Sequence, residues 1–170
     1  MQTLNRLIAL CIAIAISGVL VSCTARVHSK PGTETTIILT RHAERTIITK
    51  ILTDRGRARA KELVKTVGDM KITAIYSPDL VRNLDTVRPL AKHLGIDITV
   101  VSSKPEVDEI VETMLTRHAG EIVLWVGNTA NLSGIYYALG GEGEAPDNFG
   151  DLFILKIKDQ GFPEVIKKKY

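Results

Sequence analysis

Three residues suited to phosphate chemistry follow the ends of two apolar segments. Arg41 and His42 come directly after residues 36–40, and Arg82 lies shortly after residues 72–76. A guanidinium group presents a planar fork of hydrogen-bond donors that matches the oxygens of a phosphate. An imidazole beside that fork can attack a phosphorus whose charge is already offset, forming a covalent phosphohistidine. These residue types therefore predict a phosphoryl-transfer site centred on Arg41 and His42.

Alternating strands and helices must position these residues. We expect strands over 36–40, 72–76, 98–101, 122–126, 152–157 and 164–168. Helices are expected over 53–67, 79–94 and 131–139, with one more after a capping box of Ser103 and Glu106. This alternation predicts a three-layer α/β/α domain with a mostly parallel central sheet. Ligands of such sheets bind beyond the carboxyl ends of the strands, where the candidate residues follow.

Several segments occur in the order of one family's motifs. They are Arg41-His42-Ala43, Leu52-Thr53-Asp54-Arg55-Gly56 with Ala60, Tyr76-Ser77-Pro78-Asp79-Leu80-Val81-Arg82 with Thr86-Val87, Val126-Gly127-Asn128-Thr129, Leu139-Gly140-Gly141, and Asp151-Leu152-Phe153. Through them, nearly all of the chain after the leader resembles the histidine phosphatase superfamily, the phosphoglycerate mutase-like group, in its small members. The resemblance implies a phosphoglycerate mutase-like fold.

The same resemblance implies a role for each site residue. His42 is the expected nucleophile that accepts the phosphoryl group, while Arg41 and Arg82 bind the phosphoryl oxygens. Neither a metal nor an organic cofactor is expected, and a side-chain acid protonates the leaving oxygen. Glu44, beside His42, is expected either to act in the site or to be a solvated loop carboxylate. Arg45 is a candidate third phosphate contact, and its alternative is a surface arginine.

Other acidic residues and a second histidine are also candidates. Glu106, Asp108 and Glu109 lie near the position where the family often has its proton donor, but Glu106 is also expected to cap a helix. His118 repeats the local pattern around His42, yet it falls in the last turn of an expected helix that leads into a strand. We therefore expect His118 at the edge of the sheet opposite the site.

Three positions depart from the family's motifs. Ala43 replaces a glycine and Pro78 replaces a serine, and both changes leave the motif geometry possible. Asn128 stands where the family has a second active-site histidine, so it can donate a hydrogen bond but brings no charge. In other enzymes, removing one preorganised donor costs about 10²–10³-fold in rate. The alternatives are therefore a working phosphatase, a catalytically weak or inactive protein that binds phosphate or a phosphorylated ligand, and a structural lipoprotein with a vestigial site.

The start of the chain has the composition of an export signal. Residues 1–22 are mostly apolar and are expected to form a signal peptide. Leu20-Val21-Ser22-Cys23 resembles the lipobox of bacterial lipoproteins, which implies cleavage before Cys23, a diacylglyceryl group on its thiol and a fatty acid such as palmitate on its new amine. Residues 23–35 would then be the lipidated cysteine and a flexible tether, and residues 36–170 the domain. The alternatives are a soluble secreted protein and an uncleaved anchor.

Composition narrows the partners and the compartment. The net charge is only +3, and basic and aromatic residues are not interleaved, so nucleic acid is not an expected partner. Thr24, and not an aspartate, follows Cys23. In this respect the chain resembles the bacterial lipoproteins that are sorted to the outer membrane. We therefore expect an envelope hydrolase, lipid-anchored at the periplasmic face of the outer membrane. Its expected substrates are phosphorylated small molecules or envelope phosphoesters, hydrolysed as phosphomonoesters.

Overall fold

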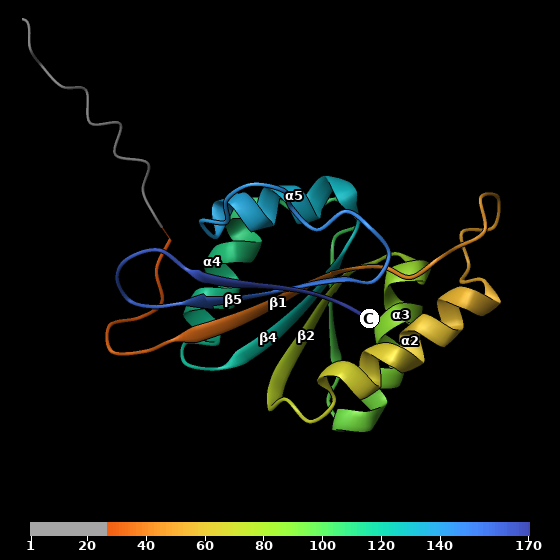
Figure 1. The fold of residues 1–170 in the computed structure, drawn as a ribbon, viewed down its shortest axis with the longest axis horizontal. Helices are drawn as coiled ribbons and strands as arrows, with labels where there is room; N and C mark the ends of the chain where they lie inside the picture. The colour runs from red at the N-terminus through yellow and green to blue at the C-terminus, as the bar shows by residue number, and fades with distance from the viewer. Residues whose placement is uncertain (1–26) are drawn as a thin grey trace, which may run out of the picture.

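A six-stranded sheet organises residues 27–170, the part of the chain that the computed structural model describes (Figure 1). The strands are β1 (Thr35–Arg41), β2 (Ile72–Pro78), β3 (Ile98–Val101), β4 (Ile122–Gly127), β5 (Asp151–Ile157) and β6 (Glu164–Lys169), in the spatial order β3-β2-β4-β1-β5-β6. The first four strands pair in parallel, whereas β5 runs antiparallel to both β1 and β6. The expected mostly parallel sheet is confirmed.

The pairing of β1 with β4 brings distant parts of the site together. Arg41, at the end of β1, lies opposite Gly127, at the end of β4. Because parallel strands end at the same edge of a sheet, the residues that follow β1 and β4 emerge beside one another. Strand β2 pairs with the other side of β4, so the start of the next helix, which carries Arg82, reaches the same edge.

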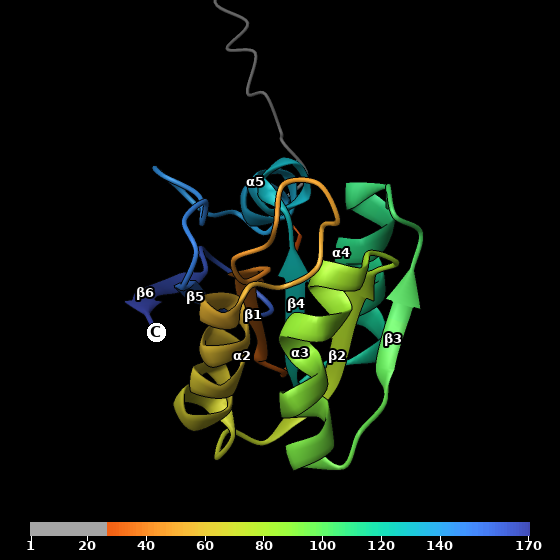
Figure 2. The same ribbon diagram turned by 90° about the vertical axis from the view of Figure 1, so that its right-hand side faces the viewer.

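Helices cover both faces of the sheet in the described part of the chain (Figure 2). They are α2 (Asp54–Val67) and α3 (Val81–Leu94) on one face, and α4 (Val107–Arg117) and α5 (Thr129–Ala138) on the other. Successive residues of β1 serve the two faces in turn, because side chains alternate along a strand. Ile37 and Leu39 belong to the core that includes α4 and α5, whereas Ile38 belongs to the core that includes α2 and α3. The three-layer architecture is confirmed.

Helix ends agree with the sequence pattern except at the start of α4. Thr53 caps α2 as expected, and its side chain accepts a hydrogen bond of 3.1 Å from the backbone nitrogen of Gly56. The capping box of Ser103 and Glu106 is wrong, because α4 begins at Val107 and its N-cap, Glu106, makes no side-chain cap hydrogen bond. A helix capped by Ser103 would need Lys104 in helical geometry, which the following Pro105 disfavours.

The segment before β1 is attached to the domain. Ser29 is buried; its backbone nitrogen donates to the carbonyl oxygen of Lys158 at 3.0 Å, and its hydroxyl lies 2.6 Å from that of Thr35. The expected tether, residues 23–35, is therefore wrong from Ser29 onward, since these contacts fix the chain before the strand begins. Cys23 and the signal peptide lie outside the described residues. None of the helices within residues 27–170 is long and apolar enough to cross a membrane.

Candidate active site

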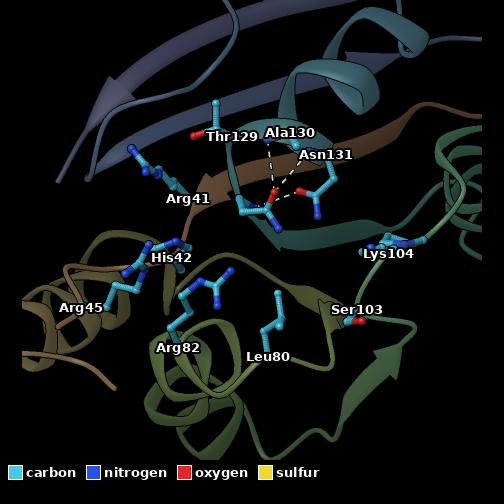
Figure 3. Close-up of a pocket in the computed structure, with 12 residues that line it drawn as sticks. Arg41, His42, Arg45, Leu80, Arg82, Ser103, Lys104, Thr129, Ala130 and Asn131 are labelled. Atoms are coloured by element: carbon cyan, nitrogen blue, oxygen red, sulfur yellow. Dashed lines mark hydrogen bonds between the residues drawn. The ribbon is translucent and has the colours of Figure 1, made fainter. Parts of the chain in front are cut away.

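A cavity of about 640 Å³ opens where the parallel strands end (Figure 3). It is lined by Arg41 at the end of β1 with His42 and Arg45 after it, Leu80 and Arg82 after β2, Ser103 to Pro105 after β3, and Asn128 to Asn131 after β4. Its size falls within the range of small-molecule sites. Apart from Glu44, the predicted site residues of the domain therefore meet in one cavity.

His42 is held in one orientation at the cavity wall. Its side chain is buried, and its backbone nitrogen donates to the carbonyl oxygen of Gly127 at 2.9 Å. Ring atom Nδ1 lies 2.8 Å from the carbonyl oxygen of Ala43. A carbonyl oxygen can only accept, so Nδ1 carries the hydrogen and the lone pair of the neutral ring lies on Nε2. This tautomer leaves the lone pair of Nε2 available for a nucleophilic role.

The charge state of His42 also suits a nucleophile. Its pKa is lowered from 6.5 to about 4, mainly by burial and in smaller part by the positive charges of Arg82, Arg41 and Arg45. The hydrogen bond to Ala43 acts against these effects but does not outweigh them. The imidazole is therefore neutral at neutral pH, as attack on phosphorus requires.

Arg82 carries a positive charge that no described residue compensates. No hydrogen bond or ion pair joins its guanidinium group to any of the residues 27–170, and its buried Nε has no partner. Burial lowers the pKa of Arg82, and the charges of Arg45 and Arg41 lower it further. Since an unpaired buried charge is costly, this arrangement favours the binding of an anion in the cavity.

Arg41 is positioned by the loop before β5. One guanidinium nitrogen, Nη1, donates to the carbonyl oxygen of Asp147 at 2.5 Å and lies 3.9 Å from its carboxylate. The guanidinium stacks on the ring of Phe149, 4.4 Å from its centroid, and Phe149 also contacts the ring of His42. Its Nε is buried without a partner among the described residues. Arg41 is thus oriented by part of its fork and keeps other donors for a ligand.

Two buried polar side chains of α3, whose roles the sequence did not indicate, connect the strand ends. The hydroxyl of Thr86 donates to the carbonyl oxygen of Arg82 at 2.7 Å and accepts from the backbone nitrogen of Ala43 at 2.9 Å. Nδ2 of Asn83 donates to the carbonyl oxygen of Val126 at 3.2 Å. These bonds fix the start of α3 against the loop that carries His42, so they position His42 and Arg82 together.

Two more cations complete the wall. Arg45 lines the cavity, as a residue that contacts phosphate must. One of its nitrogens, Nη1, donates to the carbonyl oxygen of Thr46 at 3.1 Å. Lys104 also lines it, from the loop between β3 and α4, and lies across the cavity from His42 (Figure 3). Sequence reasoning missed Lys104, because no motif marks a loop lysine as part of a site.

Asn128 has one half of its amide occupied. Its Oδ1 accepts from the backbone nitrogens of Ala130 at 3.2 Å and Asn131 at 3.4 Å, which caps α5. The side chain of Asn131 accepts in return from the backbone nitrogen of Asn128 at 2.9 Å. The cap fixes the orientation of the amide, so Nδ2 is the group that remains for a ligand. Asn128 can therefore act at the cavity only as an uncharged donor.

Glu44 does not take part in the site, and this expectation is wrong. Its carboxylate accepts from Nε and Nη2 of Arg59 at 2.8 Å and 2.7 Å and lies 3.0 Å from Nε of Arg55. The hydrogen bonds from Arg59 lower the pKa of Glu44, and the charges of both arginines act in the same direction. A carboxylate held ionised by two arginines cannot serve as the proton donor, and Glu44 does not line the cavity.

The other acidic candidates and His118 lie away from the chemistry. Glu106, Asp108 and Glu109 are exposed, and the described cavity wall contains no carboxylate. His118 ends α4, with Nε2 lying 2.9 Å from the hydroxyl of Tyr76 and Nδ1 2.8 Å from the carboxylate of Glu121. Its expected place at the opposite edge is confirmed. No cluster of three or more metal-binding side chains occurs within residues 27–170.

Solved structures share this fold. Bacillus stearothermophilus YhfR is 21% identical with a TM-score of 0.64, covering 77% of this chain and 95% of that one. The protein histidine phosphatase SixA in complex with tungstate is 15% identical with a TM-score of 0.62, covering 79% and 96%. Phosphoglycerate mutase from Plasmodium falciparum is 19% identical with a TM-score of 0.56, covering 81% and 91%.

Sequence comparison matches part of the chain to one family. No curated protein matches the chain. A sequence model of the histidine phosphatase superfamily (branch 1) does match, over residues 37–110. This segment includes Arg41, His42 and Arg82, and the remaining strands complete the fold that the solved structures share. Residues 37–110 thus match the histidine phosphatase superfamily (branch 1), and the chain shares its fold with structures such as the phosphoglycerate mutase and SixA.

Proposed function

We propose that the protein is a phosphatase that hydrolyses phosphomonoesters through a phosphohistidine formed at His42. The observation that carries this proposal is the neutral, buried imidazole of His42 beside the uncompensated guanidinium of Arg82. The unpaired charge favours an anionic ligand, and the lone pair on Nε2 favours attack on its phosphorus. The match of residues 37–110 to the histidine phosphatase superfamily supports a phosphatase activity in general.

The reaction takes two displacements. In the first, Nε2 of His42 forms a bond to phosphorus, the bond from phosphorus to the ester oxygen breaks, and the leaving oxygen takes up a proton from solvent. In the second, water attacks the phosphorus, the bond to Nε2 breaks, and the proton of the water leaves with inorganic phosphate or to solvent. Arg41 and Arg82 offset the charge of the phosphoryl oxygens in both steps, and Nδ2 of Asn128 adds a neutral donor.

A catalytically weak protein that binds phosphate or a phosphorylated ligand is the second candidate. Asn128 is the observation that favours it, because an amide whose oxygen caps α5 brings no charge to the phosphoryl group. The cavity retains its binding residues in either case. The two functions therefore differ in turnover and not in ligand.

An assay of aryl phosphate hydrolysis distinguishes the phosphatase from the phosphate-binding protein. It compares the parent protein with His42→Ala and Asn128→His. We expect activity in the parent, none in His42→Ala, and faster turnover in Asn128→His. Acid-quench of a reaction with labelled substrate should trap a phosphorylated protein in the parent alone. A parent no faster than His42→Ala, together with Asn128→His gaining nothing, would leave phosphate binding as the function.

We further propose that Cys23 is lipidated and holds the domain at a membrane of the cell envelope. The lipobox-like sequence supports this location. Ser29 is fixed to the domain six residues after Cys23, so the anchor lies within about 20 Å of this point. Ser29 precedes the amino end of β1, whereas the cavity opens at its carboxyl end. A domain held in this way turns its cavity away from the bilayer, and its substrates are soluble phosphoesters or those that extend well beyond the membrane surface.

Metabolic labelling with a radioactive fatty acid tests the anchor. We expect label in the parent and none in Cys23→Ala, and we expect the variant to leave the membrane fraction. Equal membrane retention of Cys23→Ala without label would instead indicate an uncleaved apolar anchor.

A further inference from the structure

The cavity combines several cations with an absence of acidic groups. Arg41, Arg45 and Arg82 line it near His42, and Lys104 lines it on the far side (Figure 3). No carboxylate belongs to the wall that the described residues form. Building on the proposed phosphatase function, we propose that the site acts preferentially on phosphoanhydrides, and that Lys104 binds the phosphate that leaves when the terminal phosphoryl group of a diphosphate is transferred to His42.

The leaving group decides whether an acid is needed. An alkyl ester departs as a strongly basic alkoxide, so its departure requires a proton donor in the site. A phosphate monoester has a second pKa of about 6, so it departs from a diphosphate as a stable anion and needs no proton. A cavity without an acid is therefore matched better to an anhydride than to an alkyl ester.

Asp147 is a carboxylate that contacts two residues of the cavity wall, and its contacts do not suit a donor. Its carboxylate accepts from the hydroxyl of Thr129 at 2.6 Å and lies 3.9 Å from a guanidinium nitrogen of Arg41. A carboxylate in these contacts acts as an acceptor that helps to orient Arg41. Arginine side chains do not lose their protons in proteins, so the guanidinium groups cannot supply the acid either.

Lys104 supplies what an anionic leaving group needs. It is exposed, and no ion pair joins its ammonium group to another residue within the described range. Its loop lies after β3, on the side of the cavity away from Arg41 and Arg45 (Figure 3). The arginines can thus hold the transferred phosphoryl group while Lys104 offsets the charge on the departing phosphate.

The proposed reaction balances without a further reactant. The bond from Nε2 of His42 to the terminal phosphorus forms as the bond from that phosphorus to the bridging oxygen breaks. Both electrons of the broken bond stay with the bridging oxygen, which leaves as part of the monophosphate product. Water then hydrolyses the phosphohistidine to inorganic phosphate, and its second proton passes to solvent or to the product.

The leaving-group dependence of the full-length protein tests this proposal. We expect kcat/KM to fall steeply across aryl phosphates as the pKa of the leaving phenol rises. The reason is that no acid in the site protonates the leaving oxygen and so reduces the differences between good and poor leaving groups. An alkyl diphosphate should exceed the monophosphate of the same alcohol by about 100-fold or more. Lys104→Gln should lower the ratio of diphosphate to aryl phosphate turnover by about 10- to 100-fold. Lys71→Gln, an exposed lysine at the other end of β2, is the matched control and should leave that ratio unchanged.

Three outcomes overturn the proposal. The first is that an alkyl monophosphate is turned over as fast as the diphosphate of the same alcohol. The second is that Lys104→Gln leaves the ratio of diphosphate to aryl phosphate turnover unchanged. The third is a shallow leaving-group dependence that becomes steep in Asp147→Asn, which would identify Asp147 as an acid. If aryl phosphate hydrolysis still depends on His42 in these cases, the phosphatase function stands and only the anhydride preference fails. If no substrate shows turnover that depends on His42, both fail together.

Discussion

Arginine side chains occur in two neighbouring regions of this protein and have opposite surroundings. On α2, Arg59 makes two hydrogen bonds to the carboxylate of Glu44 and a third to the backbone oxygen of Tyr170. In the cavity, Arg82 has no such partner among the described residues, although it too is partly buried. The two regions are close along the chain, because His42 of the cavity and Glu44, the partner of Arg59, lie in the same loop.

The difference teaches which charges serve the fold and which serve a ligand. A partly buried cation with a bidentate carboxylate partner repays its desolvation within the protein. A partly buried cation without a partner lowers stability until an anion arrives, and natural proteins retain such groups where function requires them. The following predictions test this division, from the largest expected effect to the smallest.

Removal of the uncompensated charge should affect activity and spare the fold. We expect Arg82→Met to lower kcat/KM by about 10³-fold, because a phosphoryl group loses its fixed positive partner. The free energy of unfolding should rise by about 1 kcal/mol, because an unpaired charge is removed. Steady-state kinetics and urea denaturation measure the two effects. Loss of stability in Arg82→Met would show that this arginine has a structural partner.

Removal of the compensated charge should do the reverse. We expect Arg59→Met to lower the free energy of unfolding by about 3 kcal/mol, because Glu44 then stays partly buried without its main partner. Turnover per folded molecule should persist, since neither residue lines the cavity. The double variant Arg59→Met with Glu44→Gln is the control and should recover part of the lost stability. A large loss of turnover at full folding would return Glu44 to the active site.

A charge added to the cavity should sharpen the comparison further. We expect Asn128→His to raise kcat by about 10-fold, because a protonated imidazole adds a charged donor to the phosphoryl group. Some stability should be lost at the same time, since the side-chain oxygen that caps α5 is removed. Asn128→Asp keeps a capping oxygen but adds the wrong charge, and its turnover should fall below that of the parent. The kinetics of the three proteins at one pH decide the point.

The smallest effect concerns the titration of His42. Burial and the cavity arginines lower its pKa from 6.5 to about 4, so phosphate that offsets those arginines should raise it. The unfolded chain binds the proton more readily than the native protein, so the contribution of His42 to stability is present above about pH 6.5 and is lost as the pH falls toward 4. NMR titration of the ring with and without phosphate measures the shift. An unchanged pKa would mean that phosphate does not bind beside His42.

Most of the fold could be predicted from the sequence because its determinants are local. The period of apolar residues gave the strands and helices, with β1 and β2 differing from expectation by at most two residues. The prediction of a helix start was wrong where a neighbouring residue restricts the backbone conformation. Ser103 has the right residue type and spacing for a cap, but Pro105 next to Lys104 excludes that helix start, and Ser103 lines the cavity instead.

The meeting of Arg41, His42, Arg82 and Asn128 followed from sequence alone. All four residues lie at or shortly after the ends of parallel strands, and the carboxyl ends of such strands share one edge. Only the tertiary structure decided how the charges are distributed at that edge. Glu44 pairs with Arg59, which belongs to the next helix, and Lys104 lines the cavity from the loop after β3. The physical reason is that the pairing of a charge depends on distances of a few ångströms between side chains from separate elements, which the order of residues along the chain does not contain.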